Sequence, residues 1–144
     1  MPGESAAERE DFSIPVRVYY EDTDAGGVVY YANYLRFMER ARTEWLRALG
    51  FEQDALSVNE RVIFAVRAIK VDFFKPGRFN ELLQATVGVR RVGSASITFR
   101  QQIQRDATTL CQAEVKIACL DVESFAPRAI PAGIVSQLNR VNLS

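Results

Sequence analysis

The chain has 144 residues, of which 48% are hydrophobic, so one domain with a substantial core is the expected organisation. Lysine plus arginine and aspartate plus glutamate number 18 each, and this balance gives no net field that would draw the chain to nucleic acid or to a membrane surface. The histidine count is zero, which excludes Ser-His-Asp and Cys-His catalysis and histidine zinc sites, and leaves carboxylates, hydroxyls, amines and backbone dipoles for any chemistry.

The N-terminal residues 1–12 are polar, and we expect a disordered extension there, followed by a single domain over residues 13–144. Residues 14–20, rich in valine and tyrosine, predict a strand, and Pro15 marks its beginning or a sheet edge. The extension contains no apolar segment, so no secretory leader is expected, and no run approaches the roughly 20 apolar residues of a membrane span. The expected location is therefore the cytoplasm.

An acidic, glycine-bearing loop follows the first strand and leads into a helix. All five tyrosines lie between Tyr19 and Tyr34, with Asp22 and Asp24 among them. A carboxylate there can serve as a base or nucleophile, the glycines admit a ligand close to the backbone, and the N–H groups of the helix start can hold developing negative charge. We therefore take this loop as the candidate active site. The alternative from the residues alone is a plain turn in which Asp24 caps its own loop.

Residues 33–49 predict the longest helix, because apolar residues recur at helical spacing. The apolar positions are Tyr34, Phe37, Met38, Ala41, Trp45, Ala48 and Leu49. Asn33 is the expected N-cap, and Gly50 followed by Phe51 is typical of a helix C-terminus. Residues 57–60 are expected to form a loop before the next element.

From residue 63 onward the hydrophobic period changes from helical to alternating, which predicts four strands in succession. The strands cover residues 63–73, 83–89, 95–103 and 111–119. In the first of them, one face is expected to carry Ile63, Ala65, Ile69, Val71 and Phe73. Turns are predicted at residues 75–77 and 105–108, and a short final helix at residues 134–141. This order predicts an α+β fold, a five-stranded antiparallel sheet wrapped around one long helix.

The two cysteines, Cys111 and Cys119, fall on one predicted strand, about 26 Å apart, which is too far for a disulfide within the chain. We expect both to be small buried apolar side chains. The sequence contains no C-x-x-C, no G-x-G-x-x-G and no Walker A lysine loop. No metal and no cofactor is therefore expected.

Three stretches carry a family resemblance: Asp-Thr-Asp-Ala-Gly-Gly-Val-Val-Tyr at residues 22–30, Glu-Arg-Ala-Arg-Thr-Glu at residues 39–44 and Pro-Arg-Ala-Ile-Pro at residues 127–131. Over residues 16–131 the chain resembles the hotdog-fold acyl-CoA thioesterases of the 4-hydroxybenzoyl-CoA thioesterase family, and within it the branch associated with the bacterial Tol-Pal system. The resemblance implies the hotdog fold and the hydrolysis of acyl-CoA to a free acid and coenzyme A.

The resemblance also assigns roles near the loop. It implies that Asp24 is the catalytic carboxylate, as nucleophile or general base, and that the backbone N–H of Tyr31 polarises the thioester carbonyl. The Tol-Pal-associated branch usually has histidine at the position of Tyr31, whereas the 4-hydroxybenzoyl branch has tyrosine. A backbone donor survives this exchange, but an imidazole acid or base does not. Asp22 is expected to hold the loop, and Glu39 is a second candidate carboxylate, whose alternative is an exposed partner for a neighbouring arginine.

Binding residues are expected in the loop and at the ends of the later strands. Within the loop, Gly26 and Val28 are expected to contact the substrate. Coenzyme A carries phosphates, and guanidinium groups suit phosphate geometry. The expected contacts to the coenzyme are Arg90, Arg91, Ser94 and Arg128. The alternative for these arginines is a solvated position at a strand end.

The implied partners are acyl-CoA, acyl carrier protein and further copies of the chain, in a homodimer or homotetramer with a continuous sheet. The active site would then lie between the Asp24 loop of one subunit and the strands of its partner. Two other functions remain open at this point. One is a hydroxyacyl thioester dehydratase, against which the absence of histidine argues. The other is a non-catalytic acyl-thioester or acyl-carrier-protein binding protein of the cell-envelope machinery.

Overall fold

The computed structural model describes residues 12–143. The predicted extension over residues 1–12 lies outside this part of the chain, except for Phe12, which is the first residue of a strand rather than part of the extension. The strands are β1 (Phe12–Arg17), β2 (Val62–Phe73), β3 (Leu82–Val92), β4 (Ser96–Arg105) and β5 (Thr108–Asp121). The helical elements are η1 (Tyr20–Asp22), α2 (Tyr31–Ala48), α3 (Gln53–Ala55), η2 (Leu56–Glu60) and α4 (Ala132–Leu143).

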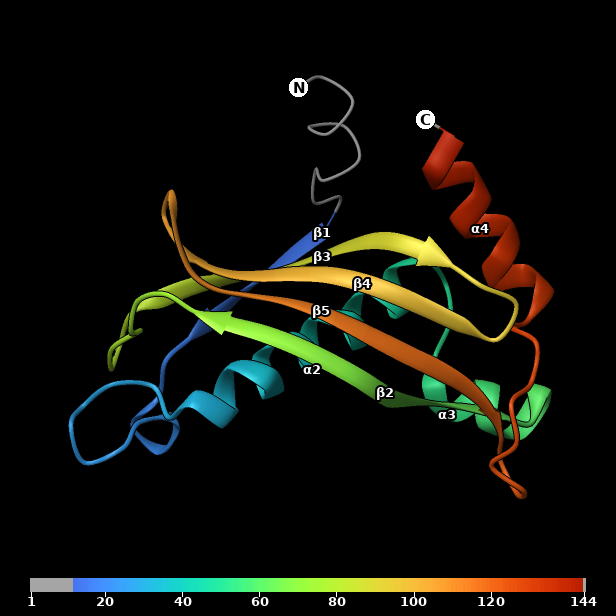
Figure 1. Ribbon diagram of the computed structural model, residues 1–144, viewed down its shortest axis with the longest axis horizontal. Helices are drawn as coiled ribbons and strands as arrows, with labels where there is room; N and C mark the ends of the chain where they lie inside the picture. Colours follow the sequence, from blue (N-terminus) through green and yellow to red (C-terminus); the bar gives the residue numbers. More distant parts are fainter. Residues whose placement is uncertain (1–11, 144) are drawn as a thin grey trace.

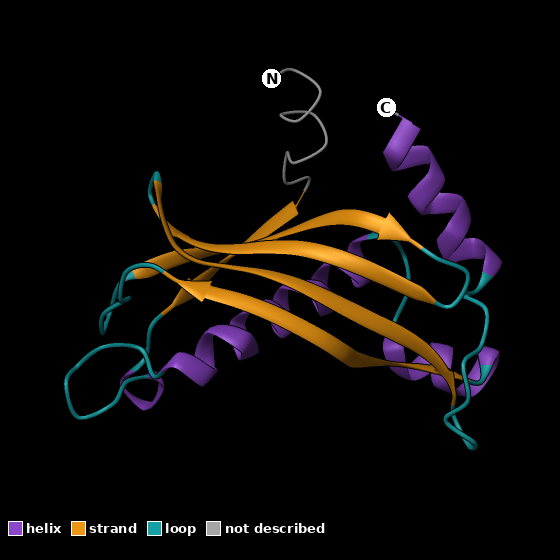
Figure 2. Ribbon diagram, in the orientation of Figure 1, coloured by secondary structure: helices purple, strands orange, loops and turns teal. Residues whose placement is uncertain are grey.

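The five strands form one sheet in the order β1-β3-β4-β5-β2, and every neighbouring pair is antiparallel. Figure 1 shows the curved sheet with the long helix α2 lying along one face, and Figure 2 shows the same layers by element type. This arrangement confirms the predicted α+β fold. The helix packs against β1, β3 and β4, so the side of the sheet at β5 and the edge strand β2 is less covered by it.

Helix α2 supplies the centre of the core. Its buried side chains are Tyr34, Phe37, Met38, Ala41, Trp45 and Leu46, which confirms most of the predicted apolar stripe. The helix begins at Tyr31, two residues before the predicted N-cap Asn33, which instead lies within the first turn. At the other end Gly50 has φ of 99°, and the N–H groups of Gly50 and Phe51 donate to Arg47 and Leu46 carbonyls, so the predicted C-terminal stop is confirmed.

Strand β2 departs from the predicted alternation at one point. Val66 pairs with Ile117 and Ala68 pairs with Lys116, so Arg67 is an extra residue, a β-bulge. The bulge shifts the side-chain phase of the first half of the strand. The prediction that Ile63 and Ala65 share the face of the later apolar residues is therefore wrong. The residues directly opposite the buried face of β5 are Phe64, Val66, Ile69, Val71 and Phe73.

The remaining strands follow the sequence pattern closely. Ile97, Phe99, Gln101 and Ile103 of β4 are all buried, as their alternation predicted. The predicted hairpin between β4 and β5 is a two-residue turn, in which Asp106 has φ of 54°. The predicted loop at residues 57–60 is instead the helical turn η2, and the final helix starts at Ala132. The first strand ends at Arg17 rather than at residue 20, because the chain turns into η1.

Candidate active site

The loop that contains Asp24 is a short hairpin that ends at the first turn of α2. Asp22, Thr23 and Asp24 run antiparallel to Val28, Val29 and Tyr30. The N–H of Asp24 donates to the carbonyl of Val28 at 2.9 Å, and the N–H of Tyr30 donates to the carbonyl of Asp22 at 2.9 Å. The tip is closed by the N–H of Gly27 on the carbonyl of Asp24 at 3.0 Å. Gly27 has φ of 81°, a conformation that glycine adopts without steric cost.

The carboxylate of Asp22 anchors this hairpin. Its Oδ2 accepts the backbone N–H of Tyr19 at 2.8 Å, and its Oδ1 accepts the side-chain Nδ2 of Asn33 at 2.8 Å. Asn33 lies on α2, so one carboxylate joins the end of β1, the hairpin and the helix. The expectation that Asp22 holds the loop is confirmed by these contacts.

Asp24 is exposed beside the tip of the hairpin. Its Oδ1 accepts the backbone N–H of Gly26 at 2.8 Å, which is the self-capping turn that the residues alone also allowed. No other hydrogen bond or ion pair of the Asp24 side chain is found among residues 12–143, so its second oxygen has no protein partner there. A carboxylate that is half engaged by its own turn keeps one oxygen for a substrate or a water molecule.

Tyr31 is the first residue of α2, and its side chain is 60% exposed. The N–H groups of a first helical turn have no partner within the helix, and no backbone acceptor for the Tyr31 N–H is found in the described part of the chain. The Tyr31 ring lies 4.8 Å from that of Tyr30 and 6.0 Å from that of Phe73 on β2. The expected oxyanion donor therefore lies at the same end of the molecule as Asp24, next to the end of the edge strand.

Tyr34 supports this region from within the core. Its hydroxyl accepts the backbone N–H of Gly77 at 2.8 Å, and burial raises its pKa. Gly77 is packed so closely that a Cβ would lie 3.2 Å from a methyl of Val29 and 3.3 Å from one of Leu83. The turn between β2 and β3 is thereby fixed against the start of α2.

The predicted substrate-binding residues fall into two separated groups. Gly26 and Val28 lie in the hairpin with Asp24, and Val28 also bridges Arg78. Arg90, Arg91 and Ser94 lie at or beyond the end of β3, and Arg128 lies after β5. Strand β3 starts beside the hairpin and extends about 33 Å from it, so these residues are at the opposite end of the sheet (Figure 1). Within one chain they do not meet Asp24.

The two groups also differ in their contacts. Arg90 forms an ion pair with Glu114 at 3.2 Å, and the carbonyl of Ser94 accepts the N–H of Ile130. Arg128 donates to Asp121 at 2.7 Å. Backbone N–H groups of Ser124 and Glu123 and then the Arg128 guanidinium lower the pKa of Asp121 to about 2. Arg90 and Arg128 thus have ion-pair partners within the chain, whereas the alternative that the sequence left open was a solvated position.

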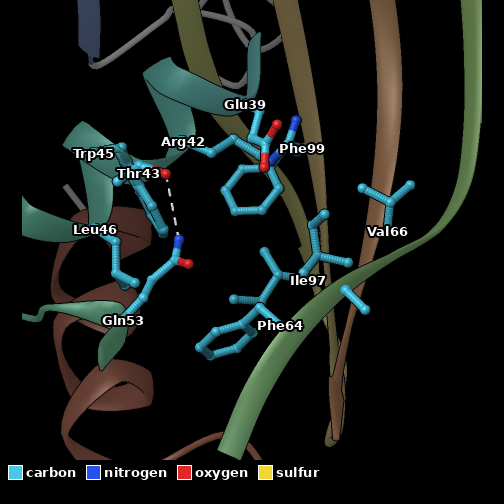
Figure 3. A pocket seen from close by; sticks show the side chains of 12 residues that line it. Glu39, Arg42, Thr43, Trp45, Leu46, Gln53, Phe64, Val66, Ile97 and Phe99 are labelled. Atoms are coloured by element: carbon cyan, nitrogen blue, oxygen red, sulfur yellow. Dashed lines mark hydrogen bonds between the residues drawn. The ribbon is translucent and has the colours of Figure 1, made fainter. Parts of the chain in front are cut away.

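A cavity of about 270 Å³ lies between α2 and the sheet at β2, and the sequence did not indicate it. Its lining residues are Glu39, Arg42, Thr43, Trp45, Leu46, Gln53, Phe64, Ala65, Val66, Ile97, Phe99 and Ile117. Figure 3 shows polar side chains along the helix side and apolar ones along the strands. The cavity lies along the second half of α2 and does not include Asp24, although Glu39, the second candidate carboxylate, is exposed at its rim.

Other site types receive no support from the described residues. No group of three or more histidine, cysteine or acidic side chains that could hold a metal ion is found over residues 12–143. In the same range, none of the helices has the length and hydropathy to cross a membrane. Cys111 and Cys119 are buried and unpaired, and burial raises the pKa of Cys111 to about 12.

Comparison with known proteins identifies relatives along most of the chain. Residues 18–138 match the model of a family described as the thioesterase-like superfamily. The chain is 47% identical over 120 residues to the acyl-CoA thioesterase YbgC of Haemophilus influenzae, covering 83% of this chain and 88% of that protein. It is 45% identical over 130 residues to the acyl-CoA thioester hydrolase YbgC of Escherichia coli O6:H1, covering 90% and 96% of the two chains.

Solved structures give the same result for the fold. A probable thioesterase from Bartonella henselae superposes with a TM-score of 0.79 at 35% identity, over 83% of this chain and 98% of that chain. A 1,4-dihydroxy-2-naphthoyl-CoA thioesterase from Synechocystis superposes with a TM-score of 0.82 over 91% and 97% of the two chains. Its identity is 19%, so it bears on the fold alone. The family resemblance and the hotdog architecture expected from the sequence are both confirmed.

Proposed function

The chain belongs to the thioesterase-like superfamily, and from that membership we propose that it hydrolyses acyl-CoA thioesters to a free acid and coenzyme A. The observation that carries the proposal is the identity of 47% and 45% to two proteins named as acyl-CoA thioester hydrolases, over nearly their full lengths. The exposed Asp24 beside the open N-terminus of α2 supports it, because this pairing supplies a carboxylate and a backbone donor together.

In the proposed reaction Asp24 acts on the thioester and Tyr31 stabilises the charge. As a nucleophile, an Asp24 oxygen attacks the carbonyl carbon, the thiolate of coenzyme A leaves with the C–S electrons, and water then hydrolyses the anhydride to acid and free Asp24. As a general base, Asp24 takes a proton from the attacking water, and that proton passes to the leaving thiolate. In both routes the Tyr31 N–H faces the oxyanion, and one such donor is worth about 3 kcal/mol.

A tyrosine in place of histidine at position 31 is compatible with the proposed reaction. The proposed donor is the backbone N–H, which any residue at the helix start except proline would supply. The Oδ1 of Asp24 is held by the Gly26 N–H, so its second oxygen is the one proposed to react. A thiolate is a good leaving group, so the reaction needs no imidazole as a general acid.

We propose that two copies of the chain pair through β2. This strand is a sheet edge of 12 residues, and its inward side chains Val66, Ile69 and Phe73 remain 51%, 40% and 46% exposed. A long edge with exposed apolar residues favours pairing with another strand. Antiparallel pairing in full overlap sets Phe73 of one copy beside Val62 of the other, and Ile69 beside Val66. In this register inward residues face inward residues along the whole strand.

This pairing would bring the two separated groups of residues together. The Tyr31 ring contacts Phe73, so the Asp24 hairpin lies at the end of β2 that meets the start of β2 in the other copy. The cavity opens beside Phe64 and Val66 near that start. Arg128 also lies there, with its Nη2 3.5 Å from the Glu60 carbonyl, and it is the proposed contact for the phosphates of coenzyme A. Association of two such dimers would give the tetramer that the resemblance implies.

A second candidate function is non-catalytic binding of an acyl thioester or of acyl carrier protein, within the cell-envelope machinery. It is favoured by the contact of Asp24 with its own turn and by the absence of Asp24 from the cavity lining. We propose the cytoplasm as the location for either function.

The experiment that separates the two is a hydrolysis assay. Acyl-CoAs of several chain lengths and benzoyl-CoA are incubated with the purified protein, and released thiol is followed with a chromogenic reagent, to which the buried cysteines contribute little. We expect Asp24→Asn to lower kcat by at least about 10²-fold. Asp106→Asn, in the turn between β4 and β5, is the matched control and should leave kcat unchanged. Equal, slow release by wild type and Asp24→Asn would favour the binding function.

A further inference from the structure

Arg42 is a half-buried arginine in the middle of α2, and it points toward the sheet. Its Nη1 donates to Oε1 of Gln101 at 2.9 Å. Gln101 is fully buried, and its Nε2 donates to the carbonyls of Met38 and Thr86 at 3.1 Å each. Both N–H groups of the Gln101 amide are therefore engaged, and its oxygen can only serve as an acceptor for Arg42. This network fixes the position of the guanidinium.

The charge of Arg42 has no carboxylate partner over residues 12–143. The ion pairs of the described chain involve other arginines, and the hydrogen bond to Gln101 is with a neutral group. Burial lowers the pKa of Arg42, and Glu39 opposes this at longer range without forming an ion pair. Arg42 is half-buried, and most of its five N–H donors are not used by the protein, so they are free to meet an acceptor in the space beside the helix.

The surroundings of Arg42 indicate what that acceptor belongs to. Arg42 lines the cavity of about 270 Å³, whose deep wall is formed by Trp45, Ile97, Phe99 and Ile117, each at most 8% exposed. An apolar cavity of about 150 Å³ is enough for a benzene molecule, so this one has room for an apolar group of up to about ten carbon atoms. Figure 3 shows Arg42 and Glu39 on the same side of this space.

We propose that Arg42 determines substrate specificity by binding an oxygen acceptor at the far end of the acyl group, a hydroxyl or a carboxylate. The inference rests on the proposed function and on the proposed site between two copies of the chain. The acyl carbons would lie along the apolar wall, and the terminal oxygen would accept N–H groups of Arg42. A plain alkyl end would be buried against the same donors and leave them without an acceptor.

The acyl group would enter from the other copy of the chain. Along α2, Arg42 is 11 residues from Tyr31, which is about 17 Å at the rise of an α-helix. A six-carbon acyl group held at Asp24 is too short to reach Arg42 of the same chain. Pairing through β2 instead brings the Asp24 hairpin of one copy to the mouth of the other cavity, at Phe64 and Val66.

The test compares three acyl-CoAs of equal chain length: hexanoyl-CoA, 6-hydroxyhexanoyl-CoA and the mono-CoA thioester of hexanedioic acid. For wild type we expect kcat/KM to be at least about tenfold higher for one or both oxygenated substrates than for hexanoyl-CoA, because a hydrogen bond to a charged group is worth that much. In Arg42→Met this ratio should fall to about one. In Arg36→Met, an exposed arginine on the same helix, the ratio should match wild type.

The ratio of kcat/KM between two substrates is measured in one preparation of each variant, so it does not depend on how much of that variant is folded. If Arg42→Met fails to fold, Arg42→Lys replaces it. This variant should retain part of the preference, because lysine keeps the positive charge but lacks the paired N–H donors of the guanidinium group. A wild type that prefers hexanoyl-CoA, or shows no preference, overturns the inference and leaves the proposed function standing. A preference that survives in Arg42→Met also overturns it. No turnover of any acyl-CoA by wild type contradicts the proposed function itself, and the inference with it.

Discussion

The side chain of Asn33 donates a hydrogen bond from Nδ2 to Oδ1 of Asp22 over 2.8 Å, and this contact joins the Asp24 hairpin to the main helix. The other oxygen of Asp22 accepts the N–H of Tyr19. The direction in which the hairpin leaves the helix is therefore set by one carboxylate with partners on both sides. Asp24 follows two residues later, so its position relative to the Tyr31 N–H depends on this contact.

Asn33→Ala tests that dependence. Alanine is a better helix former than asparagine, so α2 should be retained while the link to Asp22 is lost. We expect kcat to fall roughly tenfold with little change in KM, because the loss is one of positioning. Steady-state kinetics would measure this, with Asn139→Ala on α4 as the control. A wild-type kcat in Asn33→Ala would show that the hairpin is held without this contact.

Tyr34→Phe tests the support beneath the site. Phenylalanine fills the same buried space but cannot accept the Gly77 N–H, which is left without an acceptor in the core. We expect the free energy of unfolding to fall by about 1–3 kcal/mol. Urea denaturation would measure it. Tyr20→Phe, at a ring that is 81% exposed, should change the stability by less than about 0.5 kcal/mol.

Ile69→Lys tests the proposed pairing through β2. A lysine on the inward face of an edge strand disfavours strand pairing, and in the proposed register Ile69 lies opposite Val66 of the other copy. Sedimentation should show a dimer or tetramer for wild type and a monomer of low activity for the variant. Val58→Lys, at an exposed site on η2, should associate as wild type does. A monomeric, fully active wild type would refute the shared site.

Asp121→Asn gives a pH-dependent prediction. The pKa of Asp121 is lowered from 3.8 to about 2 in the folded chain, so its ionised form stabilises the fold above the unfolded pKa. That contribution is lost as the pH falls from about 4 toward 2. Thermal unfolding of wild type and Asp121→Asn should therefore differ most near neutral pH and converge in acid. A gap in Tm that stays constant down to about pH 2 would contradict the cause assigned here.

The sequence predicted those elements whose periodicity is uninterrupted. Over residues 97–103 of β4 and 111–117 of β5 every second residue is buried, as the alternation predicts, although Thr98 is buried as well, and the turn at Asp106 follows from a short polar break. The C-terminal stop at Gly50 has its own local signal. The prediction of Asn33 as the N-cap was wrong, because asparagine can either cap a helix or donate a side-chain hydrogen bond from within the first turn. Its acceptor, Asp22, decides between these roles and lies 11 residues away in the sequence.

The cavity could not be predicted because no single segment contains it. Its walls come from α2, α3, β2, β4 and β5, and it exists because the helix covers the other half of the sheet. No sequence signal separates Arg42 from the other arginines of the helix. Its setting depends on Gln101, which is 59 residues further along the chain, and on the absence of a carboxylate ion-pair partner for Arg42 in the described chain.

The extra residue at Arg67 keeps the apolar side chains of β2 on one face, although their spacing in the sequence changes from two to three at that point. Val66 pairs with Ile117 and Ala68 with Lys116, so Phe64 and Val66 face the same way as Ile69 and Phe73. Deleting Arg67 would restore unbroken alternation without turning any of these side chains to the other face. The deletion would remove the local bend and twist that a bulge gives its strand, so it would change the curvature of the edge and not the identity of the residues that line the cavity.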